Sequence, residues 1–275
     1  MPPCRVLMAS VNDTTRTGDH GGASCYISAD IQAGGAVLHT RKIGSARGTA
    51  ILCFGDENTH GGRAGRTSTA HQRYRGTVRW PGALAAHLGP EVRVVEEGLP
   101  GRTTVHDDPV AGAHKNGLAI LPALLESHQP IDAVFLMLGT NDLKPRFSVG
   151  PVEIAQSVER LAMTVAASRA NGTGVAPQCV VIAPPPIDPR GELREVFGDA
   201  AEASHALAHH LSAAAERVGA GFIDAGAHAT VDPVDGVHLT EAGHAALAAA
   251  LAKYARSHLL DACRPSSSLS RMRMR

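Results

Sequence analysis

The chain has 275 residues, of which 44% are hydrophobic, so it can bury a substantial core within a single domain. Its 26 Lys and Arg residues balance its 26 Asp and Glu residues, and no basic block interrupts the central region. Neither nucleic acid nor a membrane is therefore expected as a partner. No apolar run approaches the length that spans a bilayer, and the N-terminus lacks the pattern of a secretory signal.

The cysteines indicate a reduced, cytoplasmic protein. Their number, five, is odd, they lie far apart, and no two form a C-x-x-C pair, which argues against a disulfide framework. Two of them fall in apolar runs of strand character and are expected to be buried thiols. The five are Cys4, Cys25, Cys53, Cys179 and Cys263.

Composition divides the chain into three parts. Residues 1–48 are rich in Gly, Ser, Thr and Asp and show no helical or strand period. They are predicted to be a disordered extension or the product of a start codon assigned too far upstream, with a small added domain as the alternative. Residues 49–260 carry the regular patterns of a folded domain. Residues 261–275, rich in Ser and Arg, are predicted to be a disordered tail.

Five short apolar runs alternate with segments of helical period along this domain. The runs at 50–54 and 133–138 are apolar at nearly every position, as in parallel strands covered on both faces. The other strands are predicted at 92–96, 179–182 and 221–224. Helices are predicted at 80–88, 116–126, 151–171, 200–218 and 240–255, the last one capped by Thr240. The alternation predicts an α/β fold with a parallel sheet between two layers of helices.

Polar or special residues follow four of the five predicted strands. Glu57 follows the first strand, Gly101 lies in the loop after the second, and Asn141 follows the third. Asp235 and His238 lie in the loop after the fifth. Because the carboxyl ends of parallel strands meet at one edge of the sheet, these residues are expected to converge on one site.

Three motifs, in this order, give the chain a family resemblance. They are Gly55-Asp56-Glu57-Asn58, Gly139-Thr140-Asn141-Asp142 and Asp235-Gly236-Val237-His238, with Glu-Glu-Gly-Leu-Pro-Gly-Arg-Thr-Thr at 96–104. From residue 50 to 259 the chain resembles the SGNH (GDSL) hydrolases, most of all their arylesterase and acyltransferase branch. The resemblance implies a three-layer, flavodoxin-like sandwich with a five-stranded parallel sheet. It also implies hydrolysis or acyl transfer of small acyl or aryl esters, without a metal or cofactor. The expected partner is a small-molecule ester, and the family also allows a homo-oligomer.

The same resemblance implies a role for each residue of the predicted site. His238 would be the acid and base, and Asp235 would orient its ring. The backbone N–H groups of residue 57 and Gly101, with the side-chain amide of Asn141, would hold the oxyanion. Position 57 is that of the nucleophilic serine in the family, and here it is a glutamate. A second departure is His60, where a tryptophan is usual near the acyl pocket.

The carboxylate at position 57 leaves several hypotheses open. Glu57 is longer than serine and could place its own oxygens on the oxyanion donors while forming an ion pair with His238, which would give a self-occluded site. Alternatively, Glu57 could itself be the nucleophile and form an acyl-enzyme anhydride. A further alternative is a non-catalytic protein that binds an acyl or carboxylate ligand in the same cleft. Thr59 and Ser68 are candidate replacement hydroxyls, although neither holds the nucleophile position.

Other polar residues have simpler interpretations. His205 and His209 are four apart on a predicted helix and could share a metal, but without the glutamate of H-E-x-x-H a solvated face is favoured. Asp107 and Asp108 are expected to form a turn rather than a cation site, and Asp56 to brace the turn before Glu57. Surface positions are favoured over cleft positions for His106, His114, Lys115 and Arg146.

Overall fold

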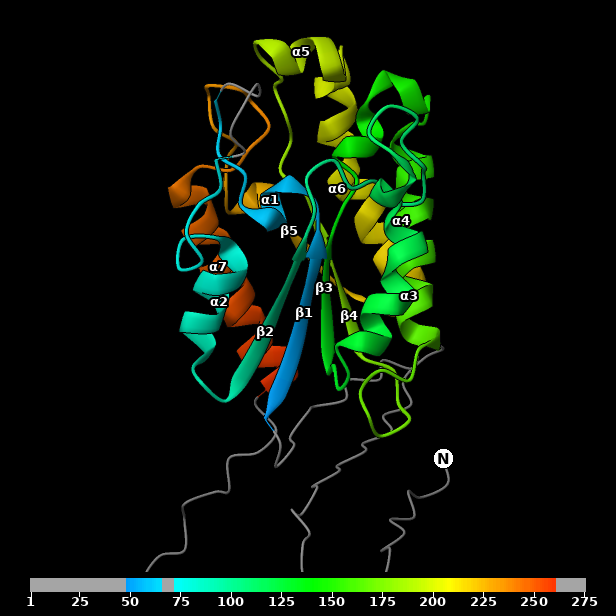
Figure 1. The fold of residues 1–275 in the computed structure, drawn as a ribbon, viewed down its shortest axis with the longest axis vertical. Helices are drawn as coiled ribbons and strands as arrows, with labels where there is room; N and C mark the ends of the chain where they lie inside the picture. The colour runs from blue at the N-terminus through cyan, green and yellow to red at the C-terminus, as the bar shows by residue number, and fades with distance from the viewer. Residues whose placement is uncertain (1–47, 66–71, 261–275) are drawn as a thin grey trace, which may run out of the picture.

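The computed structural model describes residues 48–65 and 72–260, and these form a five-stranded, all-parallel sheet with helices on both faces (Figure 1). The order of the strands is β2-β1-β3-β4-β5. This is the flavodoxin-like order, so the predicted fold class is confirmed. The strands are β1 (Thr49–Gly55), β2 (Val92–Gly98), β3 (Ala133–Met137), β4 (Gln178–Ala183) and β5 (Gly221–Asp224).

The two central strands explain why the sheet needs cover on both sides. Every residue of β1 and β3 is buried. Alternate residues of β1 enter different cores: Leu52 and Phe54 pack on one face, and Ile51 and Cys53 on the other. This alternation follows from the two-residue period of a strand. Cys53 and Cys179 are free thiols in the described part of the chain, while the other three cysteines lie outside it.

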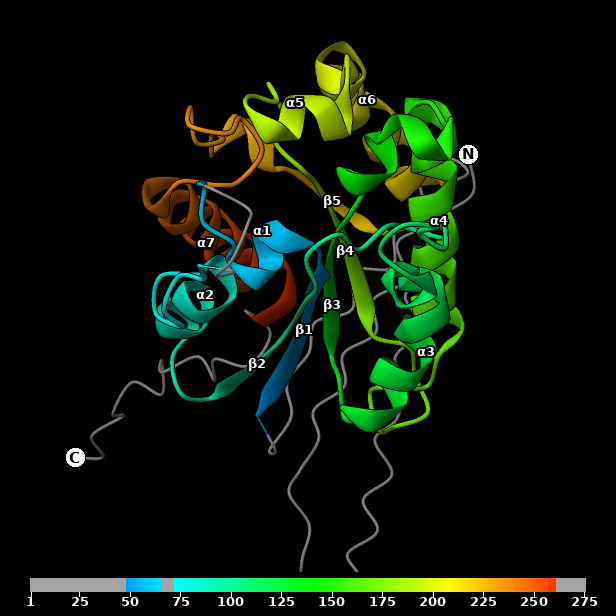
Figure 2. The same cartoon turned by 45° about the horizontal axis from the view of Figure 1, so that its top comes forward.

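Two layers of helices cover these cores, as two views of the molecule show (Figure 1, Figure 2). One layer holds α2 (Trp80–Leu88) and α7 (Glu241–Ala255). The other holds α3 (Gly117–Ser127), α4 (Pro151–Ala167) and α6 (Ala200–Arg217). Thr240 caps α7 as predicted, because its Oγ1 accepts a hydrogen bond of 2.9 Å from the Gly243 N–H.

Some helix boundaries differ from the prediction. Helix α4 ends at Ala167 rather than near residue 171, because Ser168 takes an extended conformation. Two short helices were not predicted: α1 (Glu57–His60) and α5 (Glu192–Phe197). A π-helical turn, Arg256–Leu260, extends α7. The predicted extension and tail lie almost wholly outside the described residues, as does Ser68.

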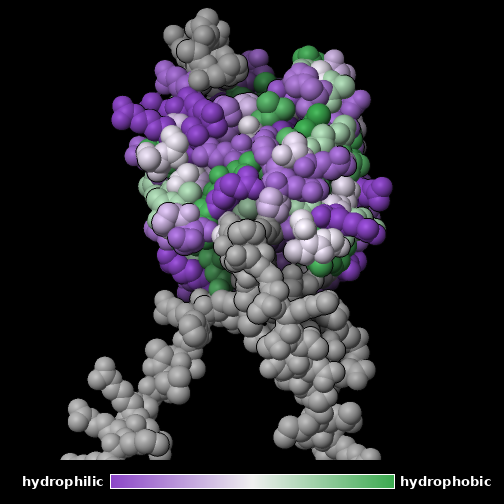
Figure 3. All heavy atoms as spheres, turned by 60° about the horizontal axis from the view of Figure 1, so that its bottom comes forward, coloured by the Kyte–Doolittle hydropathy of each residue, from purple (hydrophilic) through white to green (hydrophobic). Residues whose placement is uncertain are grey.

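None of the described helices is both long enough and apolar enough to cross a membrane. Figure 3 looks at the end of the molecule where the strands begin, and hydrophilic and hydrophobic residues are interspersed over its coloured part. The large hydrophobic side chains that are exposed lie apart in the sequence: Val110, Val152, Met163 and Val234.

Candidate active site

Glu57 stands at the carboxyl end of the central strand β1, where it begins the short helix α1. The turn forms because Asp56 caps this helix: its Oδ1 accepts a hydrogen bond of 3.0 Å from the Asn58 N–H, the bracing role that was predicted for it. Burial, reinforced by the neighbouring Glu57, raises the pKa of Asp56 well above its ordinary value. Of the two neighbouring carboxyl groups, Asp56 therefore holds a proton more readily than Glu57, whose pKa is lowered.

The Glu57 carboxylate occupies two of the three donors that were predicted to hold an oxyanion. Its Oε2 accepts hydrogen bonds from the Gly101 backbone N–H at 3.0 Å and from Asn141 Nδ2 at 2.8 Å. Gly101 has a φ of 78°, a conformation that glycine adopts without strain and that aims its N–H at the site. Loops after β2 and β3 thus meet the end of β1, as the shared sheet edge led us to expect. The side chain bridges both donors through one oxygen.

Charged neighbours keep this carboxylate ionised. Burial alone would raise the pKa of Glu57, which is 6% exposed. The positive charges of Lys144 and His238 and the hydrogen bonds from Asn141 and Gly101 outweigh burial and lower this pKa. Glu57 is therefore a charged acceptor at neutral pH.

Asp235 and His238 form the pair that their spacing predicted. His238 Nδ1 lies 2.7 Å from Asp235 Oδ2, and Asp235 Oδ1 accepts the N–H groups of Val237 at 2.9 Å and of His238 at 3.0 Å. Burial would lower the pKa of His238, but the hydrogen bond to Asp235 and the charge of Glu57 raise it. The imidazolium form is thereby favoured beside two carboxylates.

Asn58 joins the helix that carries Glu57 to the loop that carries His238. Its Nδ2 donates to the Val237 carbonyl at 3.1 Å, and its Oδ1 accepts the Leu239 N–H at 2.8 Å. Gly62 leaves room for the ring, since a Cβ at this position would lie 2.9 Å from His238 Cδ2. Asn58 belongs to the first motif, but the local sequence does not indicate this connecting role. Its partners are about 180 positions away and carry no local signal.

Comparison with known proteins identifies the family of the chain. The model of the GDSL-like lipase/acylhydrolase family matches residues 53–246. The chain belongs to this family. It is thus an SGNH (GDSL) hydrolase, and the sequence-based assignment to a family of ester hydrolases is confirmed. A search of curated proteins found no match.

Several solved structures are similar to this SGNH hydrolase. An aryl esterase of M. smegmatis, solved with an inhibitor, is 40% identical over 77% of this chain and 100% of that chain, with a TM-score of 0.73. Est24, a carbohydrate acetylesterase from Sinorhizobium meliloti, is 38% identical over 76% and 99%, with a TM-score of 0.72. A carbohydrate acetylesterase family member from the same organism is 33% identical over 77% and 99%, with a TM-score of 0.70.

Two lysines bring positive charge to the oxyanion donors of this SGNH hydrolase. Lys115 Nζ donates to the Pro100 carbonyl at 2.8 Å, and its side chain passes over Gly101. Lys144 follows Asn141 by three residues, and its Nζ lies 5.4 Å from the centre of the Phe197 ring. Surface solvation was favoured for Lys115, and this expectation is wrong because the side chain is half-buried against the donor loop.

A buried arginine ties the same loop to the end of the sheet. Arg102, 4% exposed, donates to the Gly55 carbonyl at 2.9 Å and also to the Glu97 carbonyl, and its guanidinium lies 4.2 Å from the centre of the Phe54 ring. Burial, despite Glu97 and Asp56 nearby, lowers the pKa of Arg102 to about 10. It remains charged at neutral pH. Arg102 lies within the motif at 96–104, but the local sequence does not indicate this role.

The remaining candidates are buried or have structural partners. The Thr59 hydroxyl is fully buried and has no hydrogen-bond partner among the described residues. The Nδ1 atom of His60 lies 3.3 Å from the Gly98 carbonyl oxygen. Asp108 forms the expected turn, accepting the Val110 and Ala111 N–H groups. Surface positions were also favoured for Arg146 and His106, but Arg146 pairs with Asp108 at 3.1 Å and His106 stacks on Phe147.

The histidine pair considered as a metal site lies on α6, and both rings are exposed there. Within residues 48–65 and 72–260, no group of three or more His, Cys, Asp or Glu side chains is placed to hold a metal ion. His205 and His209 therefore have the solvated position that the sequence favoured for them.

Proposed function

We propose that this chain is an SGNH-type carboxylic-ester hydrolase for small acyl or aryl esters, and that Glu57 closes its oxyanion hole in the resting state. One observation carries the proposal: Glu57 Oε2 accepts both the Gly101 N–H and the Asn141 amide. An oxyanion formed from an ester carbonyl would need these two donors together with the backbone N–H of residue 57. The relatives named for aryl esters and carbohydrate acetyl groups support the choice of small esters.

The rest of the machinery suits a hydroxyl nucleophile at position 57. Asp235 fixes Nδ1 of His238, which leaves Nε2 as the atom that would exchange protons with a nucleophile and a leaving group. With glutamate at position 57, the attraction between carboxylate and imidazolium holds that proton on His238. The protonated form of the base is therefore favoured, and two of the three oxyanion donors are already filled. Both effects slow attack on an ester.

The test is steady-state hydrolysis of p-nitrophenyl acetate by the protein and by Glu57→Ser. Glu57→Ser should turn over at least about 1,000-fold faster, since loss of the hydroxyl in such enzymes costs on the order of a million-fold. Adding His238→Ala to Glu57→Ser should abolish this gain, whereas His209→Ala, on the exposed face of α6, should leave it intact. Equal rates in the protein and in Glu57→Ser, both lost with His238→Ala, would instead identify the carboxylate as a working nucleophile.

The same experiment separates the hydrolase from a protein that only binds carboxylates. The second function is favoured by one feature: a carboxylate already sits on the donors, with the positive charges of Lys144 and His238 near it. If Glu57→Ser hydrolyses no ester although it folds, a binding role replaces the proposed one. Saturable binding of acetate to Glu57→Ala without turnover would then define the ligand class.

A further inference from the structure

The two donors that hold the Glu57 carboxylate come from loops that the sheet does not join directly. Gly101 follows β2 and Asn141 follows β3, and β1 lies between these strands. The hydrogen bonds of the sheet therefore do not by themselves fix the separation of the donors. Because a displacement of about 1 Å in an active site can lower a rate about 100-fold, this separation matters for catalysis.

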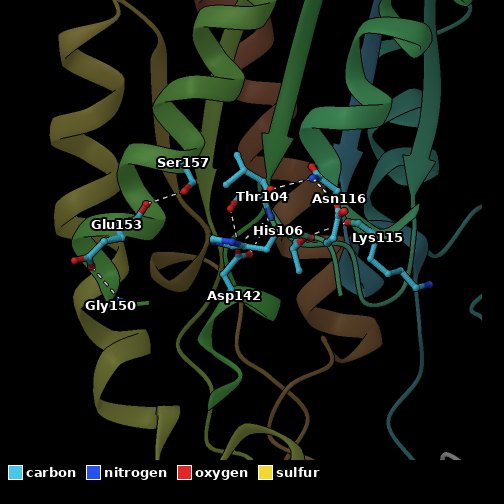
Figure 4. A network of polar contacts seen from close by, with 11 residues as sticks. Thr104, His106, Lys115, Asn116, Asp142, Gly150, Glu153 and Ser157 are labelled. Carbon is cyan, nitrogen blue, oxygen red and sulfur yellow. Dashed lines mark hydrogen bonds and ion pairs between the residues drawn. The ribbon is translucent and has the colours of Figure 1, made fainter. Parts of the chain in front are cut away.

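Asp142 and Thr104 connect the two loops. Asp142 follows Asn141, and its carboxylate, which is fully buried, accepts the Thr104 N–H at 3.0 Å through Oδ1 and 3.1 Å through Oδ2. The Thr104 hydroxyl donates to Oδ1 at 2.5 Å. Thr104 lies three residues after Gly101 and is also fully buried. Figure 4 shows the two side chains facing each other.

Both ends of this connection are anchored in regular structure. The Thr104 carbonyl accepts the Leu118 N–H at 2.9 Å, which fixes the segment to the first turn of α3. Asp142 lies within a 3₁₀ turn, Asn141–Leu143, that begins at the donor residue itself. A shift of Thr104 relative to Asp142 would therefore be transmitted to Gly101 on one side and to Asn141 on the other.

His106 lies beside the Asp142 carboxylate and packs against Phe147. His106 Nε2 lies 3.9 Å from Asp142 Oδ1 (Figure 4). The His106 ring stacks on Phe147 with 5.5 Å between the ring centres. Burial raises the pKa of Asp142, and the hydrogen bonds from Thr104 and the nearby His106 oppose the rise. Burying a carboxylate is costly, so such a group is better explained by the geometry it imposes than by stability.

We propose that Asp142 and Thr104 are positioning residues that set the separation between the Gly101 N–H and the Asn141 amide. Neither residue touches the ester in this account. Their effect on turnover rests on the proposed function. Their effect on the Glu57 carboxylate, which already uses both donors, can be measured without any turnover.

The first experiment measures p-nitrophenyl acetate kinetics in the Glu57→Ser protein. Adding Thr104→Val removes the hydroxyl while keeping the shape of the side chain, and should lower kcat about 100-fold with little change in KM. Thr104→Ser restores a hydroxyl and should restore kcat. Thr164→Val, which removes an exposed hydroxyl on α4, is the matched control. Equal kcat values for Thr104→Val and Thr164→Val would overturn the proposal.

The second experiment titrates the Glu57 carboxyl by carbon-13 NMR in the protein with its own Glu57. Thr104→Val and Asp142→Asn should each raise the Glu57 pKa, because displaced donors stabilise the carboxylate less, and Thr104→Ser should not. Asp142→Asn tests the same contact if Thr104→Val does not fold. An unchanged Glu57 pKa in the folded variants would refute the positioning role. A raised pKa together with an inactive Glu57→Ser protein would leave that role standing and refute the hydrolase instead.

Discussion

At the scale of single residues, Glu57 and His238 act on each other through charge. The pKa of Glu57 is lowered and that of His238 is raised, and each group contributes to the shift of the other. Glu57→Gln keeps the length of the side chain but removes its charge. We predict that this variant lowers the pKa of His238, as measured from its ring protons by NMR. Glu126→Gln, on the exposed side of α3, is the control, and an unchanged His238 pKa in Glu57→Gln would contradict the charge coupling.

These two shifts also define a pH window for stability. Because the pKa of His238 is raised in the folded protein, protonated His238 stabilises the fold. This stabilisation is fully present below pH 6.5, the ordinary pKa, and is lost as the pH rises through the pKa of the folded protein. Because the pKa of Glu57 is lowered in the folded protein, ionised Glu57 also stabilises the fold. This stabilisation is fully present above pH 4.5, the ordinary pKa, and is lost as the pH falls through the pKa of the folded protein. The difference in unfolding free energy between the protein and Glu57→Gln should therefore be largest between pH 4.5 and pH 6.5.

At the scale of elements, His244 joins the two helices on one face of the sheet. It is fully buried in α7, and its Nδ1 accepts the backbone N–H of Trp80, the first residue of α2, at 3.3 Å. Burial, with smaller effects of His238 and Arg79, lowers the pKa of His244 from 6.5 to about 4. The ring is therefore neutral in the folded protein at neutral pH. The unfolded chain binds this proton more readily, so acid weakens the contact between the helices.

The consequence can be measured by urea unfolding at a series of pH values. Lowering the pH from 6.5 to about 4 should remove about 3 kcal/mol of stability through His244, at about 1.4 kcal/mol per unit of pKa shift. His244→Gln cannot titrate and should show a shallower slope over this range. His209→Gln, an exposed histidine of α6, should keep the slope of the parent. Identical slopes in the protein and in His244→Gln would show that His244 is not the group responsible.

The elements that the sequence missed are those with weak local signals. Helix α5 has only six residues between Gly191 and Gly198, too few to show a helical period. The glycine at 172 is a common stop signal and predicts a helix that continues to residue 171, but the chain leaves helix α4 at Ser168. The strands were found because apolar runs of strand length, ended by glycine and polar residues, alternate with helical periods.

At the scale of the whole molecule, topology explains how much of the site could be predicted. Parallel strands place the ends of β1, β2, β3 and β5 at one edge, so Glu57, Gly101, Asn141 and the Asp235–His238 pair could be grouped from sequence alone. The hydrogen bonds that connect the loops of this group could not be predicted from the sequence. Asn58 and Asp142 bind residues that are 38 to 181 positions away, and no local pattern encodes such a partner. The limits of the domain at 49–260 stay a prediction.

Occlusion of the oxyanion hole by Glu57 can be tested by the binding of phenylboronate, a mimic of the oxyanion, followed by calorimetry. If Glu57 fills the oxyanion hole, Glu57→Ala frees two hydrogen-bond donors and should bind the boronate at least about tenfold more tightly than the protein does, or about 1.4 kcal/mol. Glu57→Gln should bind no better than the protein, because its side chain still reaches both donors, and Glu126→Ala serves as the exposed control. Equal affinities of the protein and Glu57→Ala would show that the carboxylate does not occlude the site.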